Sequence, residues 1–128
     1  MQFINLTKEH LVLHFHDGRK EYLPPSATVA DVEYKKVKIG SLYHMMPILR
    51  RIPVKIKNLP MPKSNVIFIV YPLVLKTLRK FERTVCENSI SALEQIVRHD
   101  VLTFYSDQQD KEGRTIITEL YTSITGND

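Results

Sequence analysis

The chain has 128 residues, of which 43% are hydrophobic and 25% charged, with 18 Lys and Arg against 14 Asp and Glu. This length fits a single globular domain over residues 1–128, and the composition is ordinary for one. The single cysteine, Cys86, excludes an internal disulfide, and the apolar run of residues 66–75 is too short to span a membrane, so we expect a soluble cytoplasmic protein without a membrane partner.

A β-hairpin is predicted near the start of the chain. Residues 10–16 alternate, with Leu11, Leu13 and Phe15 on one face, as a half-buried strand does. The Asp17-Gly18 pair then predicts a two-residue turn, because it tolerates the positive φ that such turns require. Residues 19–23 should therefore return antiparallel to the first strand, before the prolines that follow break the ladder.

Three more strands are predicted before residue 72. Residues 28–39 are rich in Val and Tyr, and residues 52–57 alternate again. The prolines at 60 and 62 predict an extended connection. Residues 65–71 are apolar on both faces, which predicts a central strand that is covered on each side.

A helix is predicted to begin at Pro72, because Val74, Leu78 and Phe81 recur at helical spacing. The helix is expected either to kink near Asn88 or to restart, and we favour a restart because Ser91 and Glu94 have the spacing of a capping box, with residues 82–97 as a helical insertion. The cations Lys76, Arg79, Lys80 and Arg83 fall on the side opposite the apolar stripe, where they form a secondary basic face that could track a phosphate backbone; a solvated helix surface would show the same pattern.

Two closing strands, residues 101–105 and 115–121, are predicted around a polar turn through Asp110 and Gly113, and residues 125–128 are expected to be a loose tail. The predicted elements together indicate an α+β fold. We expect mostly a small antiparallel β-sheet or a partly open barrel, with one helical excursion at about residues 72–98.

Charge is segregated along the sequence. Residues 35–81 contain eleven Lys and Arg and no acid, whereas the remaining residues contain all fourteen acids and only seven bases. The modest net charge of +4 therefore hides two opposed regions. A basic region of this kind favours an anionic partner.

The candidate ligand-binding residues lie in this acid-free segment. Lysines alternate with β-branched residues at 36–39 and at 54–57, and if these two strands pair, their lysines should form one positive face. Two adjacent arginines could grip phosphate, and an aromatic pair could stack on a base. The candidates are Lys36, Lys38, Tyr43, His44, Arg50, Arg51, Lys55 and Lys57. Lysines that guard an exposed edge strand would give the same pattern.

The sequence offers little support for an enzyme. It contains no phosphate loop, no dinucleotide fingerprint and no recognisable nucleophile with its base, so we expect no cofactor. His14 and His16 share one strand face with His10, as in a clip for a divalent metal, but no cysteine or second cluster supports a metal site, and we expect none. A hydrolase or nuclease that used these histidines would need acids from elsewhere in the fold.

Several stretches resemble a group of small phage and prophage proteins of uncharacterised function. They are Ile4-Asn5-Leu6-Thr7, Leu23-Pro24-Pro25-Ser26, Asn58 to Lys63 with the following strand Val66 to Val70, and the turn Glu112-Gly113-Arg114. This chain departs from the group at Lys8-Glu9, where a single proline is usual, and at Glu82 to Val97, which has no counterpart. The resemblance brings no catalytic residues. It implies a virus-related protein of the bacterial cytoplasm that counters host defence.

The sequence thus predicts a small non-enzymatic binding protein whose basic middle captures an anionic ligand, either a nucleotide signal or nucleic acid. Inhibition of host antiviral defence would follow from the resemblance. The alternative is a protein-interaction module that docks on an acidic host protein or self-assembles through its opposed charges.

Overall fold

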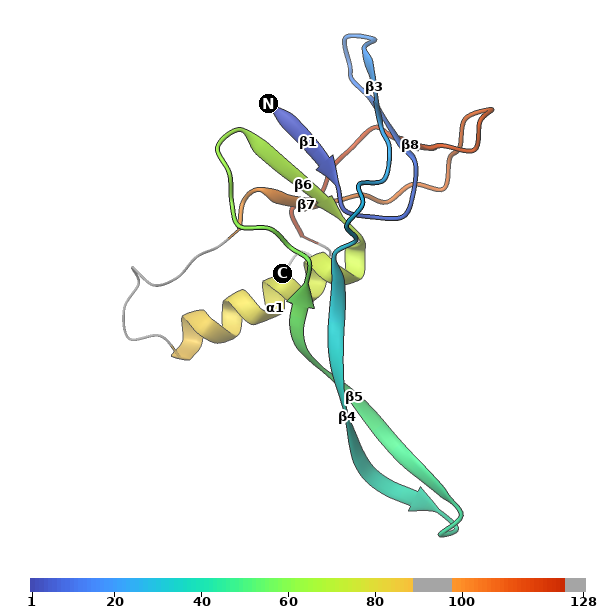
Figure 1. Cartoon of the computed structure of the whole chain (residues 1–128), viewed down its shortest axis with the longest axis vertical. Coiled ribbons are helices and arrows are strands. Elements are labelled where there is room, and N and C mark those ends of the chain that lie inside the picture. The colour runs from blue at the N-terminus through green and yellow to red at the C-terminus, as the bar shows by residue number, and fades with distance from the viewer. Residues whose placement is uncertain (89–97, 124–128) are drawn as a thin grey trace.

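The computed structural model describes residues 1–88 and 98–123. They form a small body, built from two three-stranded sheets and one helix, and a long two-stranded arm that projects from it (Figure 1). In chain order the elements are β1 (Gln2–Asn5), β2 (Leu11–His14), β3 (Lys20–Leu23), β4 (Asp31–Leu42), β5 (Met46–Lys57), β6 (Val66–Val70), α1 (Pro72–Asn88), β7 (Val101–Thr103) and β8 (Thr115–Ile117).

Strand β6 is the centre of the body. It pairs in parallel with β1 on one edge and with β7 on the other. Phe68 and Val70 pack with Val74 and Leu75 of α1, whereas Ile69 packs against the second sheet, so both faces of β6 are covered. The prediction of a central strand, apolar on both faces, is confirmed.

The second sheet has the order β3-β2-β8. Its β2–β3 hairpin confirms the prediction, but the loop has three residues rather than two. The amide of Phe15 donates to the carbonyl of Arg19 and the amide of Gly18 donates to that of Phe15, with Gly18 at a φ of 92°. This is a tight turn followed by a left-handed residue that bulges the strand, a loop that glycine makes without steric cost.

The expectation of a mostly antiparallel sheet is wrong, because three of the five strand pairs are parallel. Strand β6, helix α1 and strand β7 make a parallel crossover, and β8 joins β2 instead of pairing with β7. The two strands expected to close one turn therefore belong to different sheets. Among the described residues the fold is strand-rich with one helix, and none of its three sheets closes into a barrel.

Helix α1 begins at Pro72, as predicted, and runs on to Asn88. Val74 is buried and Leu78 packs against the same core, which confirms this part of the apolar stripe. The helix passes through residue 82 without a break, so no separate insertion begins there. The expected restart at Ser91 and Glu94, the rest of the predicted insertion and the tail 125–128 lie outside the described residues. No described helix has the length and apolar character needed to cross a membrane.

The Asn5-Leu6-Thr7 motif has a structural role. Asn5 is buried, and its side-chain amide donates to the carbonyls of Glu9 and Leu23 at 2.7 and 3.1 Å. Its side-chain oxygen accepts hydrogen bonds from the amide and the hydroxyl of Thr7. Asn5 therefore fixes the loop between β1 and β2 and ties it to the end of β3, since buried polar groups must find partners within the protein.

Candidate functional site

The arm is a two-stranded ribbon whose base alone belongs to the core. Strands β4 and β5 pair from Asp31 and Lys57 at the base to Leu42 and Met46 near the tip. Val32 is buried in the main core cluster, and Tyr34 and Ile56 pack against it. Every residue from 35 to 52 is exposed or only half-buried. At about 3.3 Å per residue this free part extends roughly 25 Å from the body, so packing of the fold does not explain it.

Both strands carry devices that discourage further strand pairing. The register shifts between Glu33 and Tyr34 and again between Lys38 and Gly40, which leaves Val54 and Ile39 without partners. Strand β5 also contains Pro47 and Pro53, neither of which has an N–H to donate. Bulges, prolines and lysines are the usual protection of exposed strand edges. The arm is therefore suited to binding through its side chains rather than through its backbone.

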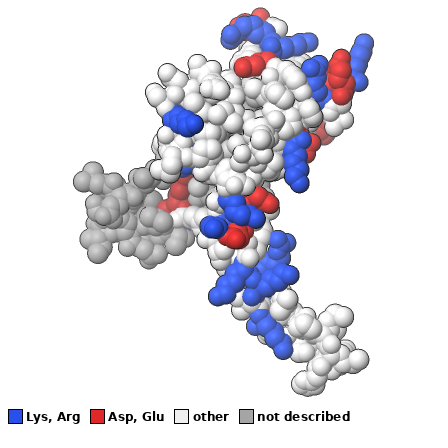
Figure 2. Space-filling model, viewed as in Figure 1, with Lys and Arg blue, Asp and Glu red and all other residues white. Residues whose placement is uncertain are grey.

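Five exposed cations lie along the middle of the arm, and we call them the basic belt. They are Lys35, Lys36, Lys38, Arg50 and Arg51. Figure 2 shows basic side chains gathered on this part of the arm. From Tyr34 to Val54 the chain contains no acid. The belt is therefore a region of uncompensated positive charge.

The belt cations have few partners of their own. The side chains of Lys35, Lys36, Lys38 and Arg50 make no hydrogen bond or ion pair with any residue in the described part of the chain. Lys36 lies opposite Arg51 in the ladder, and the guanidinium carbon of Arg51 is 4.0 Å from the centre of the Tyr34 ring. Like charges opposite each other on one face repel, and an anion placed between them would relieve that repulsion.

Sequence reasoning missed Lys35, although it opens the acid-free stretch. On a strand, Lys35 points to the face opposite Lys36, and it pairs with Ile52. Arg50, opposite Val37, shares the face of Lys35. The belt therefore presents cations on both faces of the ribbon.

The expected single face of four lysines does not form. Lys55 lies opposite Glu33, and its ammonium is 3.3 Å from the Glu33 carboxylate. Lys57 lies opposite Asp31 at the base of the arm. The strands do pair as the sequence suggested, but the register places Lys55 and Lys57 on the face opposite Lys36 and Lys38. Acids on the opposite strand thus offset the charge of Lys55 and Lys57, whereas no acid lies opposite a belt cation.

Tyr43 and His44 lie at the tip of the arm, beyond the belt. The amide of Met45 donates to the carbonyl of Leu42 across this turn, and the φ angles of Tyr43 and His44 are 50° and 60°. Turns of this hand normally use Asn and Gly.

Four exposed apolar residues surround this turn, and we call them the apolar tip. They are Leu42, Tyr43, Met45 and Met46. Tyr43 and Met45 are 83% and 87% exposed, the highest values among the exposed large hydrophobic side chains of the described residues. Figure 2 shows no charged side chain there.

Of the predicted secondary basic face, Lys76, Lys80 and Arg83 are exposed, but the expectation that Arg79 faces solvent is wrong. Arg79 is 8% exposed and binds Glu82 at 2.9 Å and the carbonyls of Thr122, Arg98 and Val101. Leu75, four residues earlier on the same helix, is also buried. Arg79 is therefore a structural residue.

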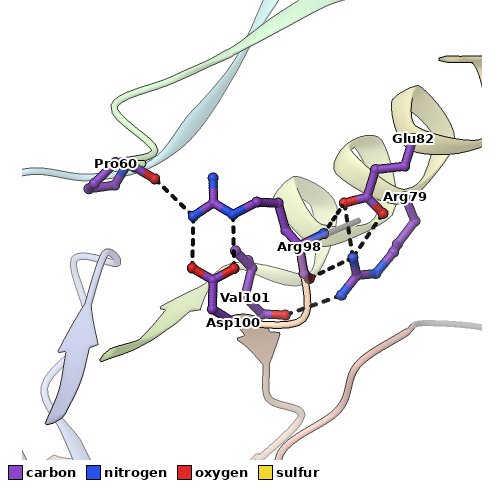
Figure 3. A network of polar contacts seen from close by, with 6 residues as sticks. All are labelled: Pro60, Arg79, Glu82, Arg98, Asp100 and Val101. Atoms are coloured by element: carbon purple, nitrogen blue, oxygen red, sulfur yellow. Dashed lines mark hydrogen bonds and ion pairs between the residues drawn. The ribbon is translucent and has the colours of Figure 1, made fainter. Parts of the chain in front are cut away.

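Arg98 extends this network (Figure 3). Its guanidinium donates two hydrogen bonds to the Asp100 carboxylate, at 2.8 and 2.9 Å, and one to the carbonyl of Pro60. Its backbone amide donates to Glu82. Helix α1, the start of β7 and the chain after β5 are thereby held together. The network satisfies buried charges inside the protein and leaves no cation of its own for a ligand.

A cavity of about 260 Å³ lies on the body, away from the arm. Phe3, Leu13, Phe15, Ile117 and Leu120 supply its apolar lining, joined by His14, His16, Thr118 and Glu119. The Glu119 carboxylate already accepts a hydrogen bond from the Tyr121 hydroxyl at 2.8 Å. Among the side chains that the structure describes, no three His, Cys, Asp or Glu form a group that could hold a metal ion. No belt residue lines this cavity.

Comparison with protein-family models, with curated proteins and with solved structures finds no match.

Proposed function

We propose that the protein binds double-stranded nucleic acid through its arm, with the phosphates on the basic belt. The observation that carries the proposal is the group of exposed, mostly unpartnered cations on a projecting ribbon that has no acid beyond its base. Four arginines of the body offer a contrast, because Arg19, Arg79, Arg98 and Arg114 each form an ion pair. Cations left without internal partners are available to phosphates.

A polymer suits this arrangement better than a single nucleotide does. The belt cations lie on both faces of a ribbon, and Tyr43 and His44 lie beyond them at its end. A nucleotide would need these groups to converge on a pocket, whereas a duplex surrounds an inserted ribbon with phosphates. Two-stranded β-ribbons bind DNA in either of its grooves. Of the two predicted ligands, we therefore propose nucleic acid rather than a single nucleotide.

The resemblance to phage and prophage proteins supplies a setting for this binding. We extend the proposal to a bacterial cytoplasm, where a non-enzymatic protein that covers nucleic acid would hide it from host defence. This part rests on the sequence motifs alone. It predicts that bacteria producing the protein become more permissive to infection, and that variants of the belt lose this effect.

A second candidate function is docking on an acidic host protein. It is favoured by the apolar side chains of the arm, which supplies nine of the fourteen exposed large hydrophobics among the described residues. An apolar centre with a charged rim is the usual anatomy of a protein interface. Such an interface would respond weakly to salt, whereas binding to a polyanion weakens steeply because counterions are released.

The proposal is tested with a labelled DNA duplex of about two helical turns, roughly 20 base pairs, and fluorescence anisotropy. The variant Lys36→Gln/Arg51→Gln removes two belt charges. Its matched control, Lys8→Gln/Lys111→Gln, removes two exposed lysine charges from the body. We expect the belt variant to bind more weakly and to reduce the salt slope by about 2, since each phosphate contact contributes close to one.

Mononucleotide added as a competitor, matched in phosphate concentration, should displace the duplex poorly. Equal loss of affinity in the belt and body variants would show that only net charge matters and would overturn the proposal. Displacement of the duplex by mononucleotide would instead support a nucleotide as the ligand. Absence of duplex binding, with capture of an acidic protein that survives raised salt, would favour the second candidate.

A further inference from the structure

We infer that the apolar tip is a wedge that enters the minor groove of B-form DNA and opens a base step, so that the duplex bends. This inference rests on the proposed function and assigns to the tip a role that the basic belt cannot perform. It also narrows the partner from nucleic acid in general to a duplex that can be deformed.

The composition of the tip is the first reason. Tyr43 and Met45 are more exposed than any other large hydrophobic side chain in the body or on the rest of the arm. Leu42 and Met46, 50% and 63% exposed, pair with each other directly behind them. Apolar surface gathered in this way marks a contact site. Side chains such as Met and Leu are those that proteins insert between base pairs.

The position of the tip relative to the belt is the second reason. Lys38, which pairs with Leu49, is the belt cation nearest the tip. Three uncharged residue pairs follow it, and the third, Leu42 with Met46, belongs to the tip. At about 3.3 Å per residue this separates belt and tip by roughly 10 Å. Phosphates of one DNA strand recur every 3.4 Å along the axis. A duplex that receives the tip therefore also brings several phosphates within reach of the belt.

The turn itself is the third reason. Tyr43 and His44 both take positive φ angles, a conformation that costs free energy in residues with a side chain. An Asn-Gly turn would close the same ribbon without that cost. The strained turn holds a large ring at the end of the arm. Its location at the apex, away from the core, indicates that the ring serves a contact rather than the fold.

Burial of the apolar tip between bases can offset the free-energy cost of deforming the duplex. Unstacking a base step is unfavourable, but burial of two large apolar side chains is favourable by a similar amount. The belt adds attraction to the phosphates on either side of the opened step. Bending is therefore expected only when tip and belt act together, and flexible pyrimidine–purine steps should be preferred.

Bending is measured by energy transfer between dyes at the two ends of a duplex, and affinity is measured on the same complex by anisotropy. Wild-type protein should bring the ends closer. The variant Tyr43→Ser/Met45→Ser should no longer bring the two ends of the duplex closer. Its affinity at low salt should fall by less than about ten-fold, a modest change in binding free energy. Lys36→Gln/Arg51→Gln should lose affinity and bending together.

Insertion of the tip is measured by fluorescence. The chain contains no tryptophan, so Tyr43→Trp introduces a single tryptophan at the apex, whose emission can be excited apart from that of the tyrosines. Its emission should be quenched by stacked bases and become shielded from acrylamide when the duplex is added. Tyr105→Trp, at a half-exposed site on the body, is the matched control and should not respond.

The outcomes separate this inference from the function on which it rests. If the duplex is bound but not bent, or if the tip variant bends it as wild type does, the wedge is wrong and the proposed function stands. Preference for single-stranded DNA with quenching of Tyr43→Trp would replace the wedge by stacking on unpaired bases. If no nucleic acid is bound, the proposed function fails together with the wedge.

Discussion

Lys36 and Arg51 lie directly opposite each other in the β4–β5 ladder, and the guanidinium carbon of Arg51 is 4.0 Å from the centre of the Tyr34 ring. Two cations are thus held on one face of a ribbon, one of them against an aromatic ring. A cation over an aromatic face is favourable by about 0.5–1 kcal/mol at exposed sites. This contact orients Arg51, but it leaves the repulsion between the two charges in place.

Replacing Lys36 by Glu should stabilise the protein and weaken duplex binding. The new carboxylate would face Arg51, and converting a like-charge pair to an opposite pair gives about 0.2–1 kcal/mol. Urea unfolding should therefore show a higher midpoint, while anisotropy shows loss of duplex affinity. A lower midpoint would contradict the proximity of the two residues. Unchanged affinity would contradict the role of the belt.

Replacing Glu33 by Gln should tighten binding to a duplex. Glu33 is the acid that pairs with Lys55, at 3.3 Å, and the Glu33 and Lys55 side chains are 41% and 64% exposed. Such a pair contributes only about 0–1 kcal/mol to stability, so the fold should tolerate its loss. The released lysine should increase the magnitude of the salt slope by up to about 1. Glu112→Gln, in a distant turn of the body, is the control that should leave the slope unchanged.

Replacing Arg79 by Leu should destabilise the protein without affecting the arm. The substitution leaves the buried Glu82 carboxylate without its ion pair, and breaking one half of a buried pair costs about 3–5 kcal/mol. Lys76→Leu, at an exposed position on the same helix, should shift the unfolding midpoint little. Equal effects of the two substitutions would contradict the assignment of Arg79 as structural. Affinity per folded molecule should be the same in both variants.

Acid should weaken the network of Arg98 and Asp100. The two hydrogen bonds from Arg98 lower the pKa of Asp100 below its ordinary value of 3.8, while partial burial opposes this shift. The stabilisation is therefore fully present above the unfolded-state pKa and is lost as pH falls through the lower folded-state pKa. Asp100→Asn should show a shallower loss of stability over this acid range. Parallel curves for the two proteins, measured by urea unfolding at several pH values, would contradict the shift.

Local signals in the sequence predicted the local elements. The Asp17-Gly18 turn specified the β2–β3 hairpin, Pro72 specified the start of α1, and the apolar faces of residues 65–71 specified a central strand. The parallel pairings of β1, β6 and β7 were missed because they join segments far apart in the chain. No short pattern records such pairings.

The candidate site was predicted in part for the same reason. The acid-free segment identified the arm's cations, and the structure gathers five of them into the belt. The side of each lysine depends on register, since a shift of one residue exchanges the faces of a strand. The sequence alone therefore could not show that Lys36 and Lys55 lie on opposite faces of the ribbon. The burial of Arg79 depends on carbonyls from residues 98, 101 and 122, which helical periodicity does not report.

The most direct test of the central claim removes the arm. Residues 36–51 are replaced by Asn-Gly, which can close the pair formed by Lys35 and Ile52 as a two-residue hairpin. The shortened protein should still fold and unfold cooperatively, because the main core cluster uses the arm only up to Tyr34 and Ile56. Wild type should show a salt slope for duplex binding of up to about −4.5, corresponding to five phosphate contacts. A folded, shortened protein that loses this binding is the predicted result, and one that binds the duplex with the same slope would contradict the account.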